Sequence, residues 1–494
     1  MLIYFLILLI HVILKHFVNS TFFLLSVIVC LGILTHYNRG IIMNTKTLSG
    51  KEVIVIGLML FALFLGAGNM IFPPALGQAA GTNIWIATAG FLITGVGLPL
   101  LGVTAIALSG MDLQSLASRI HPIFGIVFTI TMYLAIGPFF GIPRTGTVAF
   151  EIGITPFLSD TLNQSGIALF IFTVVFFGVT YSLALNPSKL IDRIGKLLTP
   201  ILLAIISILV IKSMITPMGS FQAPNEAYKQ SPFFKGFIEG YLTMDTIAAL
   251  VFGIVVISAI KEKGVTNKKI LAITTIKAGA IAAAGLMLVY VSLAYLGASS
   301  VEQIGFSTNG GEILASSSSY LFGSLGTLIL GLAITFATLT TSVGLVSSCG
   351  TYFSKIIPKL SYKTVIAIMS IFSMIIANVG LTQLLSITLP ILVMIYPLAI
   401  VLIVLSFMHS LFSGRAEVYS GGLIGASFIS ILDGLNYAGF NVSMFTNYLS
   451  DGLPLFNQGV GWVVPAIVGA FVGFVISKSR RDTTLATKEV RKVS

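Results

Sequence analysis

Charged residues are scarce in this chain, because Asp, Glu, Lys and Arg make up 9% of its 494 residues, against about 25% in soluble proteins. A soluble globular enzyme is therefore excluded. Cysteine is nearly absent as well, and Cys30 and Cys349 lie far apart in apolar surroundings, so neither a disulfide framework nor a metal cage is indicated. The sequence also lacks a His-Glu-x-x-His pair, a Gly-x-Ser-x-Gly elbow and a phosphate-binding Gly-x-x-x-x-Gly-Lys loop. These absences argue against an enzyme and against a pump with its own ATPase.

Long apolar runs fill the chain from end to end, and 56% of the residues are hydrophobic. Lipid cannot satisfy backbone N–H and C=O groups, so runs of this length must be helical. The pattern predicts an all-α polytopic membrane protein with about 12 transmembrane helices. The spans are expected near residues 53–76, 85–109, 123–150, 167–185, 197–215, 241–260, 271–297, 321–346, 364–380, 383–407, 421–437 and 460–477.

Lys and Arg residues gather in alternate polar segments between these spans. One set includes the segments around Lys189 and Lys261 and the tail after residue 477, whereas the opposite set holds only Lys212, Lys229 and Lys235. Positive residues near span ends stay on the cytoplasmic side, so both termini of the core are expected in the cytoplasm, with the core in the plasma membrane. The formal net charge of +11 is thus a topology signal, and no nucleic-acid partner is expected.

The two ends of the chain differ from its core. Residues 1–42 hold two apolar runs, separated by Lys15 and His16 and lacking a small-residue cleavage site. Met43 opens a polar segment like a normal cytoplasmic start, so we expect residues 1–42 to be an apolar extension that is not part of the native protein. The alternative is one extra span at 17–34. Residues 43–477 form the predicted transmembrane domain, and 478–494 form a basic cytoplasmic tail.

The first span contains the stretch FLGAGNMIFPP, residues 64–74. Gly costs about 1 kcal/mol and Pro about 3 kcal/mol inside a helix, so Gly66, Gly68, Pro73 and Pro74 predict a broken helix. Such a break offers free N–H groups and a positive dipole end to an anionic group, while its freed carbonyls suit a cation. Asn69 favours this interpretation over the alternative of a plain kink that permits close helix packing.

Three further spans carry polar side chains. The sixth holds Thr243 and Asp245; a carboxylate there is expensive in lipid and is expected to bind a cation, a substrate ammonium group or broken-helix N–H groups, unless it lies at the membrane interface. The eighth carries a row of hydroxyls that suit Na⁺, unless they bond only to their own helix. This row consists of Thr338, Thr340, Thr341 and Ser342. In the third span, Arg144 either gates the outer mouth, pairs with Glu151 or extends from a helix end to the interface.

With these segments, the sequence resembles the bacterial branched-chain amino acid transport system II carrier family, the leucine, isoleucine and valine:cation symporters. The resemblance covers residues 51–476 and is carried by FLGAGNMIFPP, GVGLPLLG, IGPFFGIPRT, ALNPSKLIDRIGKLLTP and GYLTMDTIAALVFG. This family lies within the amino acid-polyamine-organocation superfamily. The resemblance therefore implies two inverted five-helix repeats, spans 1–5 and 6–10, plus two additional helices.

The resemblance also implies ion sites by a more distant step. GAGN matches the Gly-x-Gly-Asn break of neurotransmitter:sodium symporters, which puts Asn69 at a position that contacts a sodium ion near the substrate, and FATLTTS resembles their FAGLTSS. On that register, the carbonyls of Ala62 and Leu65 in the first span supply ligands of a second sodium site. Its remaining ligands come from Ala337, Thr340 and Thr341 in the eighth span.

The function implied is import of leucine, isoleucine and valine by alternating access, coupled to Na⁺, with no other cofactor. The substrate is expected to contact Gly66, Ala67, Gly68, Asn69, Tyr133, Phe139, Thr243 and Asp245. Coupling to H⁺ with Asp245 as the proton carrier stays open. A sensor that binds amino acids without moving them is the alternative from another class, and a channel is disfavoured because no charged or carbonyl filter ring is evident. The partners expected are the small-molecule substrate and membrane lipid, with no obligate protein partner.

Overall fold

The computed structural model describes residues 47–493, with side chains except at 160, 187–199, 447 and 480–493. The predicted extension 1–42 lies outside the described residues, as do the side chains of the predicted basic tail from residue 480 onward. In the described part of the chain every regular element is a helix. The chain divides into two compact units: unit 1 is the described chain up to Thr104 with Ala135–Leu384, and unit 2 is Ala105–Leu134 with the chain from Leu385 onward.

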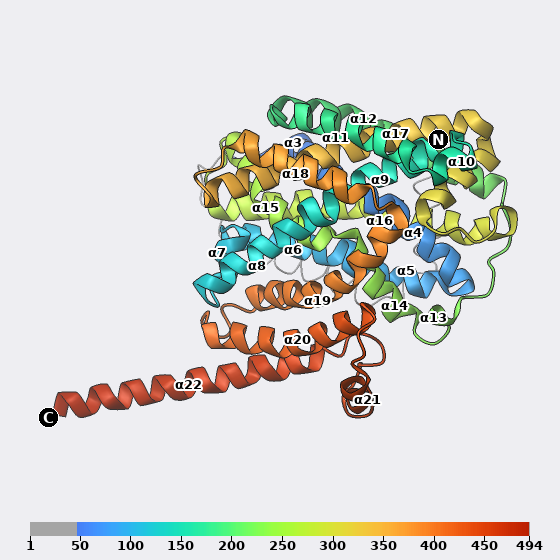
Figure 1. Cartoon of the computed structure of the whole chain (residues 1–494). Coiled ribbons are helices and arrows are strands. Elements are labelled where there is room, and N and C mark those ends of the chain that lie inside the picture. The colour runs from blue at the N-terminus through green and yellow to red at the C-terminus, as the bar shows by residue number, and fades with distance from the viewer. Residues whose placement is uncertain (1–46, 494) are drawn as a thin grey trace. The chain divides into compact units, whose positions relative to one another are not determined.

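Unit 1 contains most of the helices (Figure 1). They are α3 (Gly50–Phe64), α4 (Ala67–Ala80), η1 (Gly81–Asn83), α5 (Ile84–Leu92), η2 (Ile93–Gly97), most of α6 (Leu98–Ser109), η3 (Ala135–Phe139), α9 (Gly141–Gly153), η4 (Thr155–Phe157), α10 (Asp160–Gln164), α11 (Ile167–Ala184), α12 (Pro187–Ile215), α13 (Glu226–Lys229), α14 (Pro232–Glu239), η5 (Gly240–Thr243), α15 (Asp245–Glu262), α16 (Lys268–Ile304), α17 (Gly310–Ile356), α18 (Tyr362–Ala377) and the start of α19 (Leu381–Phe407). Unit 2 holds α7 (Leu113–Ala117), α8 (Pro122–Leu134), the rest of α19, α20 (Ala416–Tyr437), α21 (Ser443–Gly452) and α22 (Val463–Val493).

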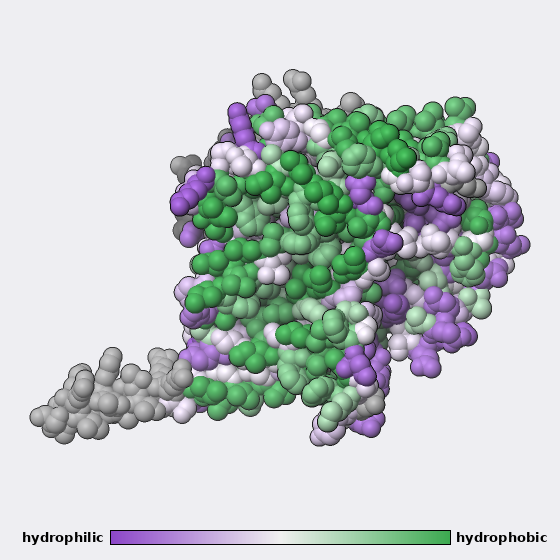
Figure 2. Space-filling view, viewed as in Figure 1, coloured by the Kyte–Doolittle hydropathy of each residue, from purple (hydrophilic) through white to green (hydrophobic). Residues whose placement is uncertain are grey.

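The helices account for the predicted spans. Each of the predicted spans overlaps one helix or up to three consecutive helices, and apolar side chains cover much of the face seen in Figure 2, as lipid contact requires. Among the described residues, seven helical stretches are long and apolar enough to cross a membrane, or eight if one bent pair is counted. This number is lower than the predicted one partly because the first span is divided into α3 and α4, of 15 and 14 residues.

The first span is interrupted at Gly66, within its glycine-rich segment. Helix α3 stops at Phe64, Gly66 is extended with φ −112° and ψ −166°, and α4 begins at Ala67. The interruption does not involve the two prolines, because Pro73 and Pro74 lie inside α4. The glycines therefore set the position of the interruption, at the point where the backbone must leave helical geometry.

The sixth span is interrupted as well, although no Gly or Pro pair marks the break as clearly as in the first span. Met244 adopts the left-handed conformation with φ 66° between η5 and α15, and the two parts of the span are bent by 44°. A non-glycine residue is rarely found in this conformation. The break is therefore held by tertiary contacts and not by a local Gly or Pro signal.

Two more interruptions occur at glycine. Gly323 has φ 67° and ψ −165° within α17, near the expected start of the eighth span, and Gly137 departs from helical geometry in η3 with ψ −123°. A positive φ is accessible to glycine at little cost. The extra length of α17 before Gly323 is therefore a separate helical segment that precedes the span.

Small residues bring helices into close contact in both units. In unit 1, a Cβ on Gly297 of α16 would lie 2.0 Å from the Pro74 carbonyl oxygen of α4, and one on Gly77 would lie 2.0 Å from the Ala294 carbonyl oxygen. In unit 2, Gly421 of α20 and Gly469 of α22 approach each other in the same way. Van der Waals packing of this kind drives helix association where lipid removes the hydrophobic contribution.

We expect Gly297→Ala to destabilise unit 1, because its methyl group meets backbone that cannot move aside. Overpacking of this kind costs roughly 1–3 kcal/mol. Thermal unfolding in detergent should show a lower midpoint for Gly297→Ala, whereas Gly178→Ala, which has open space around its Cβ in α11, should leave the midpoint unchanged or raise it. Equal midpoints for the two variants would contradict the close contact of α4 and α16.

Candidate functional site

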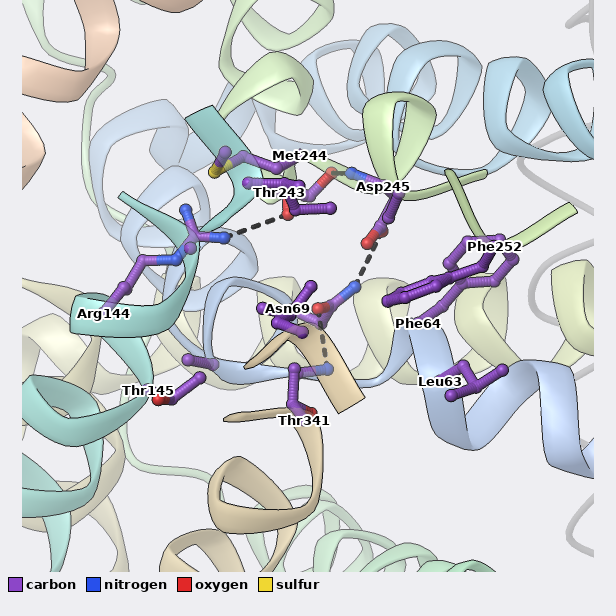
Figure 3. Close-up of a pocket in the computed structure, with 16 residues that line it drawn as sticks. Leu63, Phe64, Asn69, Arg144, Thr145, Thr243, Met244, Asp245, Phe252 and Thr341 are labelled. Carbon is purple, nitrogen blue, oxygen red and sulfur yellow. Dashed lines mark hydrogen bonds between the residues drawn. The ribbon is translucent and has the colours of Figure 1, made fainter. Parts of the chain in front are cut away.

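A cavity in unit 1 lies where the interrupted first and sixth spans meet (Figure 3). Its space, open mouth included, is about 370 Å³. The walls come from the α3–α4 and η5–α15 junctions and from η3, α9 and α17. The lining residues are Leu63, Phe64, Gly66, Ala67, Asn69, Ile136, Gly141, Arg144, Thr145, Thr243, Met244, Asp245, Ala248, Phe252, Thr341 and Leu345.

The side chain of Asn69 joins the two interruptions. Its Oδ1 accepts a hydrogen bond from the backbone N–H of Gly66 at 2.9 Å, and its Nδ2 donates to Oδ2 of Asp245 at 2.7 Å. Nδ2 also donates to the hydroxyl of Tyr290 on α16, which in turn donates to the same Asp245 oxygen at 2.5 Å. Asn69 therefore holds the extended Gly66 backbone of the first span against the carboxylate of the sixth.

Asp245 is the first residue of α15, directly after Met244. Only 2% of it is exposed, so the interpretation as a carboxylate at the membrane interface does not fit this structure. A carboxylate at a helix N-terminus is stabilised by the helix dipole, and its own backbone N–H donates to Thr243 Oγ1 at 3.3 Å. The left-handed residue before it thus aims a buried negative group into the cavity.

Arg144 of α9 supplies the positive group on another wall. It is 5% exposed, which does not fit the interpretation of a side chain extended from a helix end to the interface. Its guanidinium donates to the carbonyl oxygens of Leu242 and Thr243, the latter at 3.1 Å, and lies 5.3 Å from the centre of the Phe72 ring. Those carbonyls end the η5 turn. Glu151, which one of the interpretations pairs with Arg144, accepts a hydrogen bond from Asn309 at 3.2 Å.

The positive end of α4 lies next to the same guanidinium. A Cβ built on Gly68 would be 2.7 Å from Arg144 Nη2, so only glycine permits this approach without displacing the side chain. The first backbone N–H groups of a helix have no partner within the helix and carry a partial positive charge. The α4 N-terminus and Arg144 therefore form one wall that favours an anionic group.

Three of the four predicted hydroxyls of α17 bond to their own helix, as the alternative interpretation expects, whereas Ser342 accepts a hydrogen bond from Thr180 of α11 at 3.3 Å. Thr338 donates to the Thr335 carbonyl oxygen at 3.0 Å, Thr340 to that of Phe336 at 2.7 Å, and Thr341 to that of Ala337 at 3.2 Å. A donating hydroxyl keeps its oxygen lone pairs for another ligand. Thr341 faces the interruption, since a Cβ on Gly66 would lie 3.1 Å from its Cγ2. The carbonyl end of α3, with Ala62 and the cap residue Leu65, lies directly before the same interruption.

The structure brings together part of the predicted site. Among the described residues, the cavity walls include Gly66, Ala67, Asn69, Thr243, Asp245 and Thr341. Gly68 borders Arg144. By contrast, Phe139 is 41% exposed and its ring packs on Phe372 of α18, and Tyr133 belongs to α8 of unit 2; neither residue lines the cavity.

Sequence reasoning missed Tyr290 and Met244. Tyr290 lies in a largely apolar part of the seventh span, and its hydroxyl was the available signal, because a buried hydroxyl needs a partner. Met244 carries no local signal, since methionine does not favour positive φ. Within the described residues, no group of three or more His, Cys, Asp or Glu side chains could hold a metal ion.

We expect Asn69→Ala to destabilise unit 1, because it leaves the Gly66 N–H without its acceptor and removes one donor from the buried Asp245. Leaving a buried polar group unsatisfied costs about 1–3 kcal/mol. Thermal unfolding in detergent measures the effect. The matched control is Asn378→Ala at the C-cap of α18. This change removes an amide that donates to Thr173 Oγ1 at 3.0 Å, and neither of these residues lines the cavity. An Asn69→Ala midpoint equal to the wild-type value would contradict the bridging role.

Comparisons with known proteins agree with one another. Residues 49–480 match the family model described as "Branched-chain amino acid transport protein". The branched-chain amino acid permease BraB of Bacillus subtilis is 59% identical over 427 residues, covering 86% of this chain and 96% of the relative. The permease BrnQ of the same organism is 53% identical over 441 residues, covering 89% and 100% of the two chains.

Solved structures share the fold at low sequence identity. A sialic acid symporter, described as Na⁺-coupled and solved in a substrate-bound outward-open state, has a TM-score of 0.56 and 15% identity. The match covers 86% of this chain and 90% of the symporter. The similarity confirms the predicted all-α polytopic fold and carries no information on the substrate.

Proposed function

This chain belongs to the branched-chain amino acid transport protein family, as its resemblance predicted, and we propose that it carries leucine, isoleucine and valine across a bacterial membrane. The family is one of transporters, not of enzymes. The observation that supports the substrate class is the charge arrangement of the cavity in unit 1. One wall holds Arg144 beside the α4 N-terminus, and another holds Asp245.

An amino acid carries a carboxylate and an ammonium group on neighbouring atoms, and this cavity offers a group of opposite charge to each. The carboxylate is proposed to lie against Ala67, Gly68 and Arg144, where helix N–H groups and the guanidinium favour an anion. The ammonium group is proposed to lie against Asp245. Both protein groups are buried, so a bound zwitterion compensates charges that are costly in a membrane.

The rest of the lining accounts for an apolar substrate side chain. Apart from Gly141 and three threonines, it consists of apolar residues with no further charge: Leu63, Phe64, Ile136, Met244, Ala248, Phe252 and Leu345. One methylene in such a pocket is worth only about 1–3 kcal/mol, so leucine, isoleucine and valine are proposed to share the site. Lysine and glutamate place a charge among these side chains and are excluded.

Coupling to Na⁺ is supported by the oxygen atoms beside the first interruption. The last carbonyls of α3 have no intrahelical donor, and Thr341 faces the same interruption. Carbonyl and hydroxyl oxygens suit a hard cation. We propose that Ala62, Leu65, Ala337, Thr340 and Thr341 supply the ion site. In this arrangement the ion lies at the end of α3 and the substrate carboxylate lies at the start of α4. The interruption between these two helices therefore connects the ion site with the substrate site.

The transport cycle is proposed to be alternating access, with both core termini in the cytoplasm. The interruptions at Gly66 and Met244 divide the first and sixth spans into halves that can change orientation separately. A zwitterion contacts residues on both sides of each interruption, so its binding energy depends on how the halves are arranged. A ligand shifts a conformational equilibrium only by such a difference in affinity.

Purified protein in liposomes should accumulate radiolabelled leucine when an inward Na⁺ gradient is imposed. Excess isoleucine or valine should compete, whereas lysine and glutamate should not. Vesicles with an imposed proton gradient and no Na⁺ provide the control. Accumulation on the proton gradient alone would support H⁺ coupling instead, and leucine binding without accumulation under either gradient would contradict transport and support the sensor.

The role of Asp245 is tested by Asp245→Asn. If its carboxylate binds the substrate ammonium group, we expect both gradient-driven uptake and leucine exchange between the two sides of the membrane to fall by at least tenfold. A carboxylate that only carries a proton would leave exchange intact, which would overturn the proposed contact. Asp433→Asn is the matched control, because Asp433 is also a buried carboxylate, 8% exposed, but lies in α20 of unit 2.

A further inference from the structure

A second hollow lies in unit 2, away from any charged wall. It is a groove of about 1120 Å³, open mouth included, between helices α19, α20 and α22. All its lining residues are aliphatic or aromatic, from Trp462 at one end of the α22 side to Phe474 at the other. These two residues are 12 positions apart, which along a helix is about 18 Å. One leaflet of a bilayer's hydrocarbon core measures about 15 Å, so the groove has the length of an acyl chain.

One end of this groove is marked by positive charge. On α22, Ile467, Phe471 and Phe474 line the groove, and Lys478 follows Phe474 by one helical turn on the same face. Lys478 is exposed. The apolar stripe of the helix therefore ends in an ammonium group.

Arg415 lies at the same end. It is the cap residue before α20, and its guanidinium carbon lies 5.5 Å from the centre of the Phe474 ring. Its Nη1 donates to Ser477 Oγ at 2.9 Å, so the guanidinium is held beside the last lining residue of the groove. A guanidinium in this position can present its remaining donors to a phosphate.

Among the side chains that the structure describes, other titratable groups near this end do not cancel the charge. His409 is two residues beyond the end of α19; burial, and then the positive charge of Arg119, lower its pKa, which disfavours the charged imidazole. Glu417, in the first turn of α20, carries the one opposing charge on that helix end. Arg415 and Lys478 together leave an excess of positive charge at the mouth.

We propose that this groove binds an anionic phospholipid, with one acyl chain along the groove and the phosphate against Arg415 and Lys478. A free phosphate has no apolar part to fill the groove, and a lipid without net charge gains little from the two cations. An anionic phospholipid can make both contacts. The expected topology places this end on the cytoplasmic side, where anionic lipids attract basic residues at span ends. This site is independent of the amino acid cavity in unit 1.

The test compares phosphatidylglycerol with phosphatidylcholine on the purified full-length protein in detergent, with native mass spectrometry reading bound lipid. We expect tighter retention of phosphatidylglycerol by at least tenfold, and loss of this preference in the double variant Arg415→Gln, Lys478→Gln. The matched control is Lys359→Gln with Lys363→Gln, which should keep the preference. Both lysines are exposed; Lys359 lies between α17 and α18, and Lys363 lies in the first turn of α18. Equal retention of the two lipids by the wild type, or an unchanged preference in the Arg415 and Lys478 double variant, would overturn the proposal.

A second variant tests the groove without touching the charges. Val404 lines the groove and is 43% exposed, so Val404→Trp should fill the groove and weaken retention of both lipids. Ile431→Trp adds the same side chain at a 48% exposed position of α20 outside the groove and should bind as the wild type does. Dihexanoyl phosphatidylglycerol, whose chains are too short to fill the groove, should bind more weakly than the long-chain lipid. Equal binding of the short-chain and long-chain lipids, or of the two Trp variants, would show that the headgroup alone is recognised and would overturn the acyl-chain part.

Discussion

The hydrogen bonds of the Asn69 side chain are the interaction on which the central site of unit 1 depends. Each interruption of a membrane helix leaves backbone groups that lipid cannot satisfy. Asn69 accepts from Gly66 at the first interruption and donates to Asp245 at the second. Asn69 thus partly satisfies the polar groups that both interruptions expose. The polar groups around the resulting cavity are thereby fixed in position.

Arg144 completes the same compensation from the opposite side. Its guanidinium donates to the carbonyls of Leu242 and Thr243, which the turn before Met244 frees from helical bonding. The negative Asp245 thus starts α15, while the positive Arg144 covers the carbonyl end of the preceding turn. Both charges follow the direction of the dipoles of η5 and α15, the two helical segments that meet at Met244. One buried cation and one buried anion are thus each stabilised by the helical segment that they end or begin.

The sequence predicted the helical spans and the place of the first interruption, because apolar length and mid-membrane glycine have direct physical consequences. It also singled out Asn69 and Asp245, since an amide and a carboxylate are costly in lipid and need a partner. It did not predict the interruption at Met244, whose positive φ has no local cause and is held by packing. The expectation that Phe139 lies near the substrate failed because Gly137, two residues earlier, departs from helical geometry. The sequence pattern does not show in which direction a side chain points after such a kink.

The two candidate sites differ in what the sequence could reveal about them. The amino acid cavity uses residue types that are rare in apolar helices, so each one draws attention by itself. The groove of unit 2 is lined by residues that any membrane helix contains, and Arg415 and Lys478 are, from the sequence, only two more positive residues at span ends. Only the packing of α20 against α22, which places the Arg415 guanidinium over Phe474, sets this cation apart from the other topology signals. A charge that orients a helix during insertion can thus also hold a lipid afterwards, because both roles use the same position at the membrane surface.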